Sequence, residues 1–185
     1  EWCDGLVILR GGAVCWQKER LLNVGIEALP PWCGKVVWLD ADLVFENDAW
    51  VEETGAALDR FPVVQPFFSY VREEWDESSL GMAASQPFSG ECEGHPGFAW
   101  AARRDILSLA GLYDRCIIGG GDTIISWASF GLRWPGFNRC GYYFSLPHLA
   151  DIERWSLAWH RQVKGQVGFV SGSIGHLPHD GPRAS

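Results

Sequence analysis

Short apolar runs alternate along this chain with segments in which apolar residues recur at helical spacing. Residues 35–39 read Lys-Val-Val-Trp-Leu, a β-rich run typical of a buried central strand. In residues 16–29 the spacing is roughly helical, and Pro30-Pro31 ends the predicted helix. The whole pattern predicts strands at 6–9, 35–39, 62–68, 98–102 and 167–174, and helices at 16–29, from 47 or 48 to 59, at 105–110, 122–130 and 149–163.

This alternation of strands and helices predicts an α/β fold of three layers, α/β/α, around a mostly parallel sheet. No internal repeat or change of composition marks a boundary, so we expect residues 1–185 to form a single domain. Residues 73–97 are polar and contain glycine, and we interpret them as a long loop, which in proteins is often functional.

Charge and composition argue against several classes of protein. The formal net charge is -8, which disfavours a nucleic-acid partner, because phosphates need clustered Lys and Arg. No apolar run reaches the roughly 18 residues of a membrane span, so we expect no span in this chain. The six cysteines form no C-x-x-C pair, which favours buried thiols in a reducing compartment, and we predict a cytoplasmic location.

The strongest candidate for chemistry is Asp40-x-Asp42, directly after the strand at 35–39. Ligands of open α/β folds bind beyond the carboxyl ends of strands. Two close carboxylates repel each other, and a divalent cation such as Mg²⁺ or Mn²⁺ relieves this repulsion while it shares oxygen ligands with a phosphate. The alternative is a pair of loop carboxylates that cap the next helix.

Histidines supply a second candidate. His176 and His179 follow the last predicted strand three residues apart, and a turn of the backbone lets both reach one cation. Two surface histidines in a tail are the alternative. The remaining histidines are isolated, and we interpret them as structural or exposed: His95, His148 and His160.

A glycine-rich turn, Gly119-Gly120-Gly121, precedes Asp122 at the start of a predicted helix. The glycines permit close approach of a ligand, which makes Gly120 and Gly121 candidate substrate-binding residues. Asp122 is either a helix cap or a general base that hydrogen-bonds an acceptor hydroxyl. Because a helix dipole lowers a carboxyl pKa, base strength at Asp122 requires desolvation or a nearby phosphate.

Aromatic residues are a third signal, since the chain holds eleven tryptophans. They either pack in the core or offer flat faces on which a sugar ring stacks. Gly94-His95-Pro96-Gly97 leads into Phe98 and Trp100, which we expect to point to one face of a strand. Gly97, Phe98 and Trp100 are therefore candidate substrate-binding residues, and a hairpin loop with core aromatics is the alternative.

The order of these motifs resembles the C-terminal region of the β-1,4-galactosyltransferase family and the related bacterial family 2 glycosyltransferases. The similarity spans about residues 16–181. The matching segments are 18–25 (helix with a K-L-L-N-V-G core), 36–43 (strand ending in D-x-D), 94–104 with 111–114 (G-G…G-F), 119–122 (W-G-G-E-D-D) and 176–179 (metal segment).

This resemblance implies a GT-A fold that lacks its N-terminal strands, because the family carries base-binding strands before the helix that 18–25 resembles. It also implies a UDP-sugar donor, Mn²⁺ or Mg²⁺, and transfer to a hydroxyl of a carbohydrate or glycoconjugate acceptor with inversion.

The resemblance assigns roles residue by residue. Asp42 is expected to ligate the metal, with His176 and His179 as the other protein ligands. Asp40 is expected to bind the metal indirectly or to hold the ribose, and Asp122 to be the catalytic base. Gly121 departs from the family, which usually has Glu at this place.

Two other functions fit the same motifs. One is a non-catalytic or truncated GT-A remnant that binds nucleotide or carbohydrate without turnover, which the short segment before residue 18 favours. The other is a metal-dependent hydrolase or nucleotidyltransferase, against which the arrangement of residues 94–122 argues.

Overall fold

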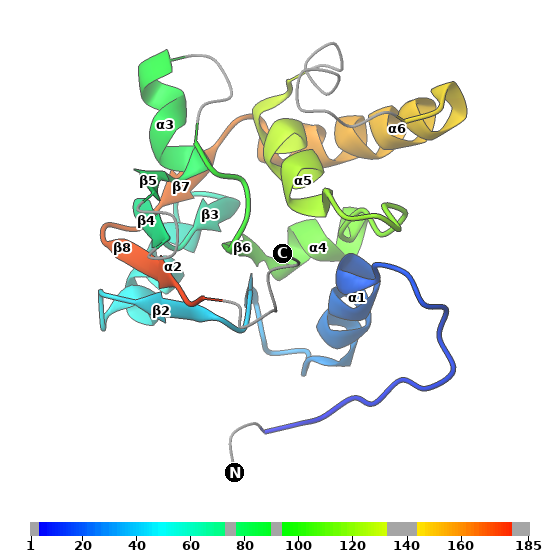
Figure 1. The fold of residues 1–185 in the computed structure, drawn as a ribbon, viewed down its shortest axis with the longest axis horizontal. Helices are drawn as coiled ribbons and strands as arrows, with labels where there is room; N and C mark the ends of the chain where they lie inside the picture. The colour runs from blue at the N-terminus through cyan, green and yellow to red at the C-terminus, as the bar shows by residue number, and fades with distance from the viewer. Residues whose placement is uncertain (1–3, 73–76, 90–93, 133–143, 179–185) are drawn as a thin grey trace, which may run out of the picture.

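The computed structural model describes residues 4–72, 77–89, 94–132 and 144–178. Figure 1 shows the mixed α/β chain, with α5 and α6 on one side and the strands β2, β8, β4 and β5 on the other. Its helices are α1 (Lys18–Ala28), α2 (Trp50–Leu58), α3 (Met82–Ser89), α4 (Arg104–Ala110), α5 (Gly121–Phe130) and α6 (Leu146–Val163). Its strands are β1 (Lys35–Leu39), β2 (Leu43–Phe45), β3 (Val63–Gln65), β4 (Ser69–Arg72), β5 (Glu77–Leu80), β6 (Ala99–Arg103), β7 (Val167–Phe169) and β8 (Ser173–His176).

The strands form two sheets of four. The first has the order β1-β6-β3-β7 and the second the order β2-β8-β4-β5. Helices cover both faces of the first sheet. Buried side chains of α4, α5 and α6 pack with one face of β1, β6 and β3, and those of α2 pack with the opposite face of β3 and β6.

The prediction of a mostly parallel sheet is wrong. Among the described strands only the pairs β3–β7 and β4–β8 are parallel, and the other four pairs are antiparallel. The physical reason is that strand–helix alternation implies parallel neighbours only when each helix returns the chain to the same sheet. Here α2 leads from β2 in the second sheet to β3 in the first, and β6 inserts antiparallel between β1 and β3.

Two local predictions also fail. Residues 6–9 are not a strand, and their side chains are more than half exposed, because no described strand pairs with them. The segment 73–97, interpreted as a loop, contains β5 and α3 in its described part. Ser78 and Ser79 of β5 are exposed, so this edge strand lacks the alternation of apolar residues that marks a half-buried strand.

The C-terminal half of the fold contains α6, which starts three residues earlier than predicted. Ser145 is its N-cap, and Pro147 in the first turn suits a helix start, where the missing N–H has no helical partner. The single strand predicted at 167–174 is two strands, β7 and β8, because Gly172 between them turns the chain at φ +115. Within the described ranges, no helix combines the length and apolar character that a membrane crossing needs.

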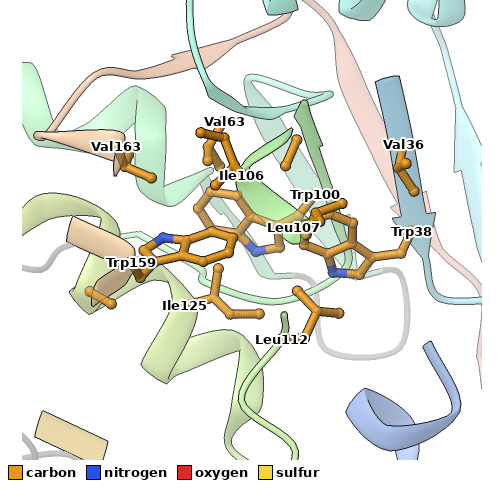
Figure 2. Close-up of a cluster of buried hydrophobic side chains, with 12 residues drawn as sticks. Val36, Trp38, Val63, Trp100, Ile106, Leu107, Leu112, Ile125, Trp159 and Val163 are labelled. Carbon is orange, nitrogen blue, oxygen red and sulfur yellow. The ribbon is translucent and has the colours of Figure 1, made fainter. Parts of the chain in front are cut away.

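Three indoles dominate the core under α4, α5 and α6 (Figure 2). Trp38 of β1 lies opposite Trp100 of β6 in the strand register, and Trp159 reaches the same cluster from α6. Trp100 and Trp159 are 0% exposed. Their N–H groups stay hydrogen-bonded, since Trp100 Nε1 donates to Pro96 O at 2.7 Å and Trp159 Nε1 to Ser129 Oγ at 2.8 Å. Core packing is therefore the role of these tryptophans.

Candidate functional site

Two aspartates that the sequence places 82 residues apart meet at one lysine. Asp40 follows β1, Asp122 is the second residue of α5, and Lys18 is the first residue of α1. Lys18 Nζ lies 2.6 Å from Asp40 Oδ1 and 3.1 Å from Asp122 Oδ2. All three side chains are only 21–32% exposed. Direct contacts therefore bring the end of β1 and the start of α5 together.

Lys18 is held in place by the anchoring of α1 to the rest of the fold. The Asn23 side chain donates to Leu112 O at 2.9 Å and accepts from Leu112 N at 2.8 Å. At the other end of α1, Arg104 donates to three carbonyl oxygens, of Ile26, Leu29 and Pro30. These bonds tie the carbonyls at and just beyond the C-terminus of α1 to α4, so α1 presents Lys18 in a defined position.

Burial raises the pKa of Asp122. Desolvation of the carboxylate is the main cause, and repulsion from Asp40 adds to it, while the Lys18 ammonium opposes both. Asp122 makes no cap bond, because Gly120 is the N-cap of α5 and no side chain caps that helix end. A base role for Asp122 requires a desolvated carboxylate, and burial provides this desolvation.

The lysine keeps its proton in this cluster. Burial alone lowers the pKa of Lys18, but attraction to Asp122 and Asp40 outweighs burial and the pKa is raised. At neutral pH an ammonium thus bridges the two carboxylates and fixes the direction in which each points.

Glu19 is a third carboxyl at this site that the sequence did not indicate. Its side chain is 3% exposed, and burial is the main cause that raises its pKa. A Cβ placed on Gly121 would lie 2.2 Å from Glu19 Oε1, so the carboxyl group of Glu19 fills the space beside the Gly121 backbone. Charged residues at a helix start are usually solvated, which is why the sequence predicted no role at the site for Lys18 or Glu19.

Gly121→Ala should therefore strain the start of α5. We expect a loss of about 1–3 kcal/mol in the free energy of unfolding, because the new methyl group must displace a buried carboxyl. Urea unfolding followed by circular dichroism measures the change. Gly55→Ala in α2 is the matched control, since nothing lies within 4 Å of its added Cβ, and we expect it to be neutral or stabilising. Equal urea midpoints for the two variants would contradict the packing of Glu19 on Gly121.

Asp42 and His176, two of the three predicted metal ligands, are also brought together. His176 ends β8, which pairs with β2 directly after Asp42, and His176 Nε2 lies 3.4 Å from Asp42 Oδ2. Adjacent ligands in an octahedron with bonds of 2.0–2.1 Å lie about 3 Å apart, so these two donors suit one Mg²⁺ or Mn²⁺ ion. The predicted ligand His179 lies outside the described residues. In the described part of the chain, no group of three or more His, Cys, Asp or Glu is placed to hold a metal.

The segment 97–100 is only partly at the site. Gly97 lies against the base candidate, since its added Cβ would be 3.9 Å from Asp122 Oδ2. Phe98 is 3% exposed and packs with Phe67 and Tyr70. Phe98 immediately precedes β6 and has φ +79, so its side chain does not continue the alternation of faces along that strand. The prediction that Phe98 and Trp100 share a face is therefore wrong, and Trp100, buried in the core, is not available to a substrate.

His95, interpreted from the sequence as structural or exposed, belongs to the site. Its ring stacks on Phe98 with centroids 4.1 Å apart, and its Nδ1 accepts from Gly97 N–H at 3.1 Å. Arg72 Nη2 lies 3.3 Å from His95 Nε2. Burial is the main cause that lowers the pKa of His95 to about 4, and the charge of Arg72 adds to it, so the imidazole is neutral at pH 7.

Phe98 connects the two halves of the site. Its carbonyl accepts from Asp40 N–H at 2.8 Å, and its ring lies 5.3 Å from that of His176. The Lys18, Asp40 and Asp122 cluster and the Asp42–His176 pair therefore flank the same residue. An open pocket of about 680 Å³ lies elsewhere, at the opposite end of β1, lined by residues that include Lys35 and Arg103.

Comparison of the chain with protein-family models, curated proteins and solved structures gives no significant match.

Proposed function

We propose that this chain is a metal-dependent glycosyltransferase that moves a sugar from a UDP-sugar donor to a hydroxyl acceptor with inversion. The observation that carries the proposal is the meeting of Asp40 and Asp122 at Lys18 Nζ, beside the Asp42–His176 pair. A desolvated carboxylate next to a candidate cation site is the pair of groups that sugar transfer from a nucleotide diphosphate needs.

In this proposal each half of the site has one task. Asp42 and His176, with His179, hold Mn²⁺ or Mg²⁺, which when bound stabilises the charge that develops on the departing diphosphate. Asp40 binds the donor ribose or supports the metal indirectly. Gly97 lies against Asp122, and Gly120 is the N-cap of the helix that carries it, so these two glycines are the proposed sugar contacts; the space beside Gly121 is occupied by Glu19.

Asp122 is the proposed base. As the acceptor oxygen attacks the anomeric carbon from the face opposite the diphosphate, the acceptor hydroxyl proton passes to a carboxylate oxygen of Asp122, and the bond to the diphosphate breaks. Attack from the opposite face inverts the anomeric configuration. Burial supports this role, because it raises the pKa of Asp122 above that of an exposed aspartate.

We further propose that the fold is of the GT-A type and that the protein is cytoplasmic. Support for the fold is a sheet with helices on both faces whose β1 leads into Asp40-x-Asp42. Support for the location is that Cys15, Cys33 and Cys116 in the described residues are free thiols.

A non-catalytic remnant that binds nucleotide or carbohydrate is the second candidate. The observation that favours it is Lys18, whose ammonium neutralises Asp40 and Asp122 and could make the cluster a structural ion-pair network. The two candidates differ in turnover. If the chain binds UDP but neither transfers a sugar to an acceptor hydroxyl nor hydrolyses the UDP-sugar donor, it is the non-catalytic remnant.

Calorimetric titration of the folded chain with UDP, with and without Mn²⁺, tests the donor site. We expect Mn²⁺ to strengthen UDP binding, and Asp42→Ala to weaken the Mn²⁺-dependent binding at least about tenfold, because the variant removes a direct ligand. Asp48→Ala, an exposed carboxylate six residues further on, is the control and should bind like the wild type. If Asp42→Ala and the wild type bind UDP alike in Mn²⁺, Asp42 is not a metal ligand.

A further inference from the structure

Arg72, which is charged, and His95, which is neutral, form a corner beside the candidate metal pair. Arg72 ends β4, and the β4–β8 register pairs it with His176. On the other side of β8, the β2–β8 register pairs His176 with Leu43, the residue after Asp42. Arg72 of β4, His176 of β8 and Asp42, directly before β2, therefore lie at neighbouring positions of the second sheet.

The hydrogen-bonding groups of His95 show that this corner is rich in donors. The Nδ1 atom accepts the Gly97 N–H, and a neutral imidazole has one acceptor nitrogen, so Nε2 carries the ring proton. Arg72 Nη2, which can only donate, lies 3.3 Å from this Nε2. With the other tautomer the same conflict falls on Gly97 N–H. With the proton on Nε2, two N–H donors face each other at Arg72 and His95, and an anionic oxygen that accepts from both relieves the conflict.

We propose that Arg72 and His95 form an anion site that binds a phosphate group of the donor diphosphate. The inference rests on the proposed function for the identity of the ligand, whereas the anion chemistry follows from the two donors. A diphosphate that bridges this corner and the Asp42–His176 pair has its negative charge neutralised from both sides.

The Arg72 side chain is positioned for this task before any ligand arrives. Its guanidinium lies 5.9 Å from the ring centroid of Tyr70 and 5.4 Å from that of Phe98. Stacked arginine loses little side-chain entropy on binding, and its planar fork matches the oxygens of a phosphate. Phe98 also carries His95 on its ring, so one aromatic residue orients both donors.

Calorimetry with two probes tests the site: inorganic pyrophosphate without metal, and UDP with Mn²⁺. Arg72→Gln keeps the packing of the stem and removes the charge, and we expect affinity for both probes to fall roughly 10- to 100-fold. His95→Phe keeps the stacking on Phe98 and removes the ring N–H, and it should weaken pyrophosphate binding to a smaller extent. Arg154→Gln, exposed on α6, is the control and should bind like the wild type.

The outcomes separate this proposal from the proposed function. If Arg72→Gln binds pyrophosphate like the wild type, or the wild type binds none, the anion site is wrong. If pyrophosphate binding depends on Arg72 while UDP with Mn²⁺ does not bind, the anion site stands and the nucleotide-sugar function fails. If circular dichroism shows that Arg72→Gln does not fold, Arg72→Lys replaces it. That variant keeps the charge without the planar fork, and undiminished affinity for pyrophosphate then overturns the bidentate role of Arg72.

Discussion

Asp122→Asn should lower the rate of sugar transfer by about 10²- to 10⁴-fold while the affinity for UDP and Mn²⁺ stays at the wild-type value. The amide has the shape of the carboxylate and can still accept a hydrogen bond from Lys18, which keeps its second partner Asp40. It cannot take the acceptor proton. Donor binding depends on Asp42, His176 and the nucleotide contacts, so the variant separates chemistry from binding. The measurements are initial rates of transfer and calorimetric titration of UDP in the same buffer.

The fold of the Asn variant should survive the change. Because the pKa of Asp122 is raised in the folded chain, protonation of Asp122 stabilises the folded state. This contribution to the free energy of unfolding is present at low pH and is lost as the pH rises. The ionised form of the buried Asp122 therefore opposes folding apart from its bond to Lys18. We expect the urea midpoint of Asp122→Asn at pH 7 to be close to that of the wild type.

The pH dependence of the wild-type rate gives an internal check. Because the base must be ionised, transfer should rise with pH through the raised pKa of Asp122. Lys18→Met removes the ammonium that stabilises the carboxylate, so this rising limb should shift to higher pH. Transfer by the Asn variant at the wild-type rate would exclude Asp122 as the base.

Trp100→Ala should cost about 3–5 kcal/mol in the free energy of unfolding, the largest stability change we expect from one substitution. The indole is 0% exposed, lies opposite Trp38 in the β1–β6 register and donates to Pro96 O. Removing it leaves a large cavity between β6 and α6 and an unpaired carbonyl. Urea unfolding measures the loss, and Trp32→Ala, 83% exposed, is the control with no expected change.

A second variant distinguishes the core role of Trp100 from the substrate-binding role that the sequence suggested. Trp100→Phe keeps most of the ring volume, so enough folded protein should remain for titration with UDP and Mn²⁺. We expect unchanged UDP affinity, because the buried ring does not reach the site. A urea midpoint of Trp100→Ala equal to that of the wild type would contradict the burial of this residue.

Elements with a strong local pattern were predicted well from the sequence. The Lys-Val-Val-Trp-Leu run is β1, and the helices predicted at 105–110 and 122–130 are α4 and α5 within one residue at each end. Their apolar periodicity is a property of neighbouring residues, so no distant contact is needed to recognise it. Elements with weak local signals were missed, as with the polar edge strand β5.

The candidate site divides in the same way. The acidic residues Asp40, Asp42 and Asp122 stand out in the sequence because each follows a strand or a glycine-rich turn, positions at which carboxylates do chemistry. Lys18, Glu19 and His95 have no such position. They were found only because the tertiary fold carries them to the aspartates or to the Asp42–His176 pair.

The sequence by itself therefore determined which segments are helices and strands with strong periodicity, and which acidic residues are candidates for chemistry. The tertiary structure decided the directions of the strands, the burial of Trp100 and the partners of every carboxylate at the site. The physical reason is that the type of an element follows from side chains a few residues apart. Strand pairing, desolvation and ion pairing depend instead on groups that are distant in sequence and become neighbours only when the chain folds.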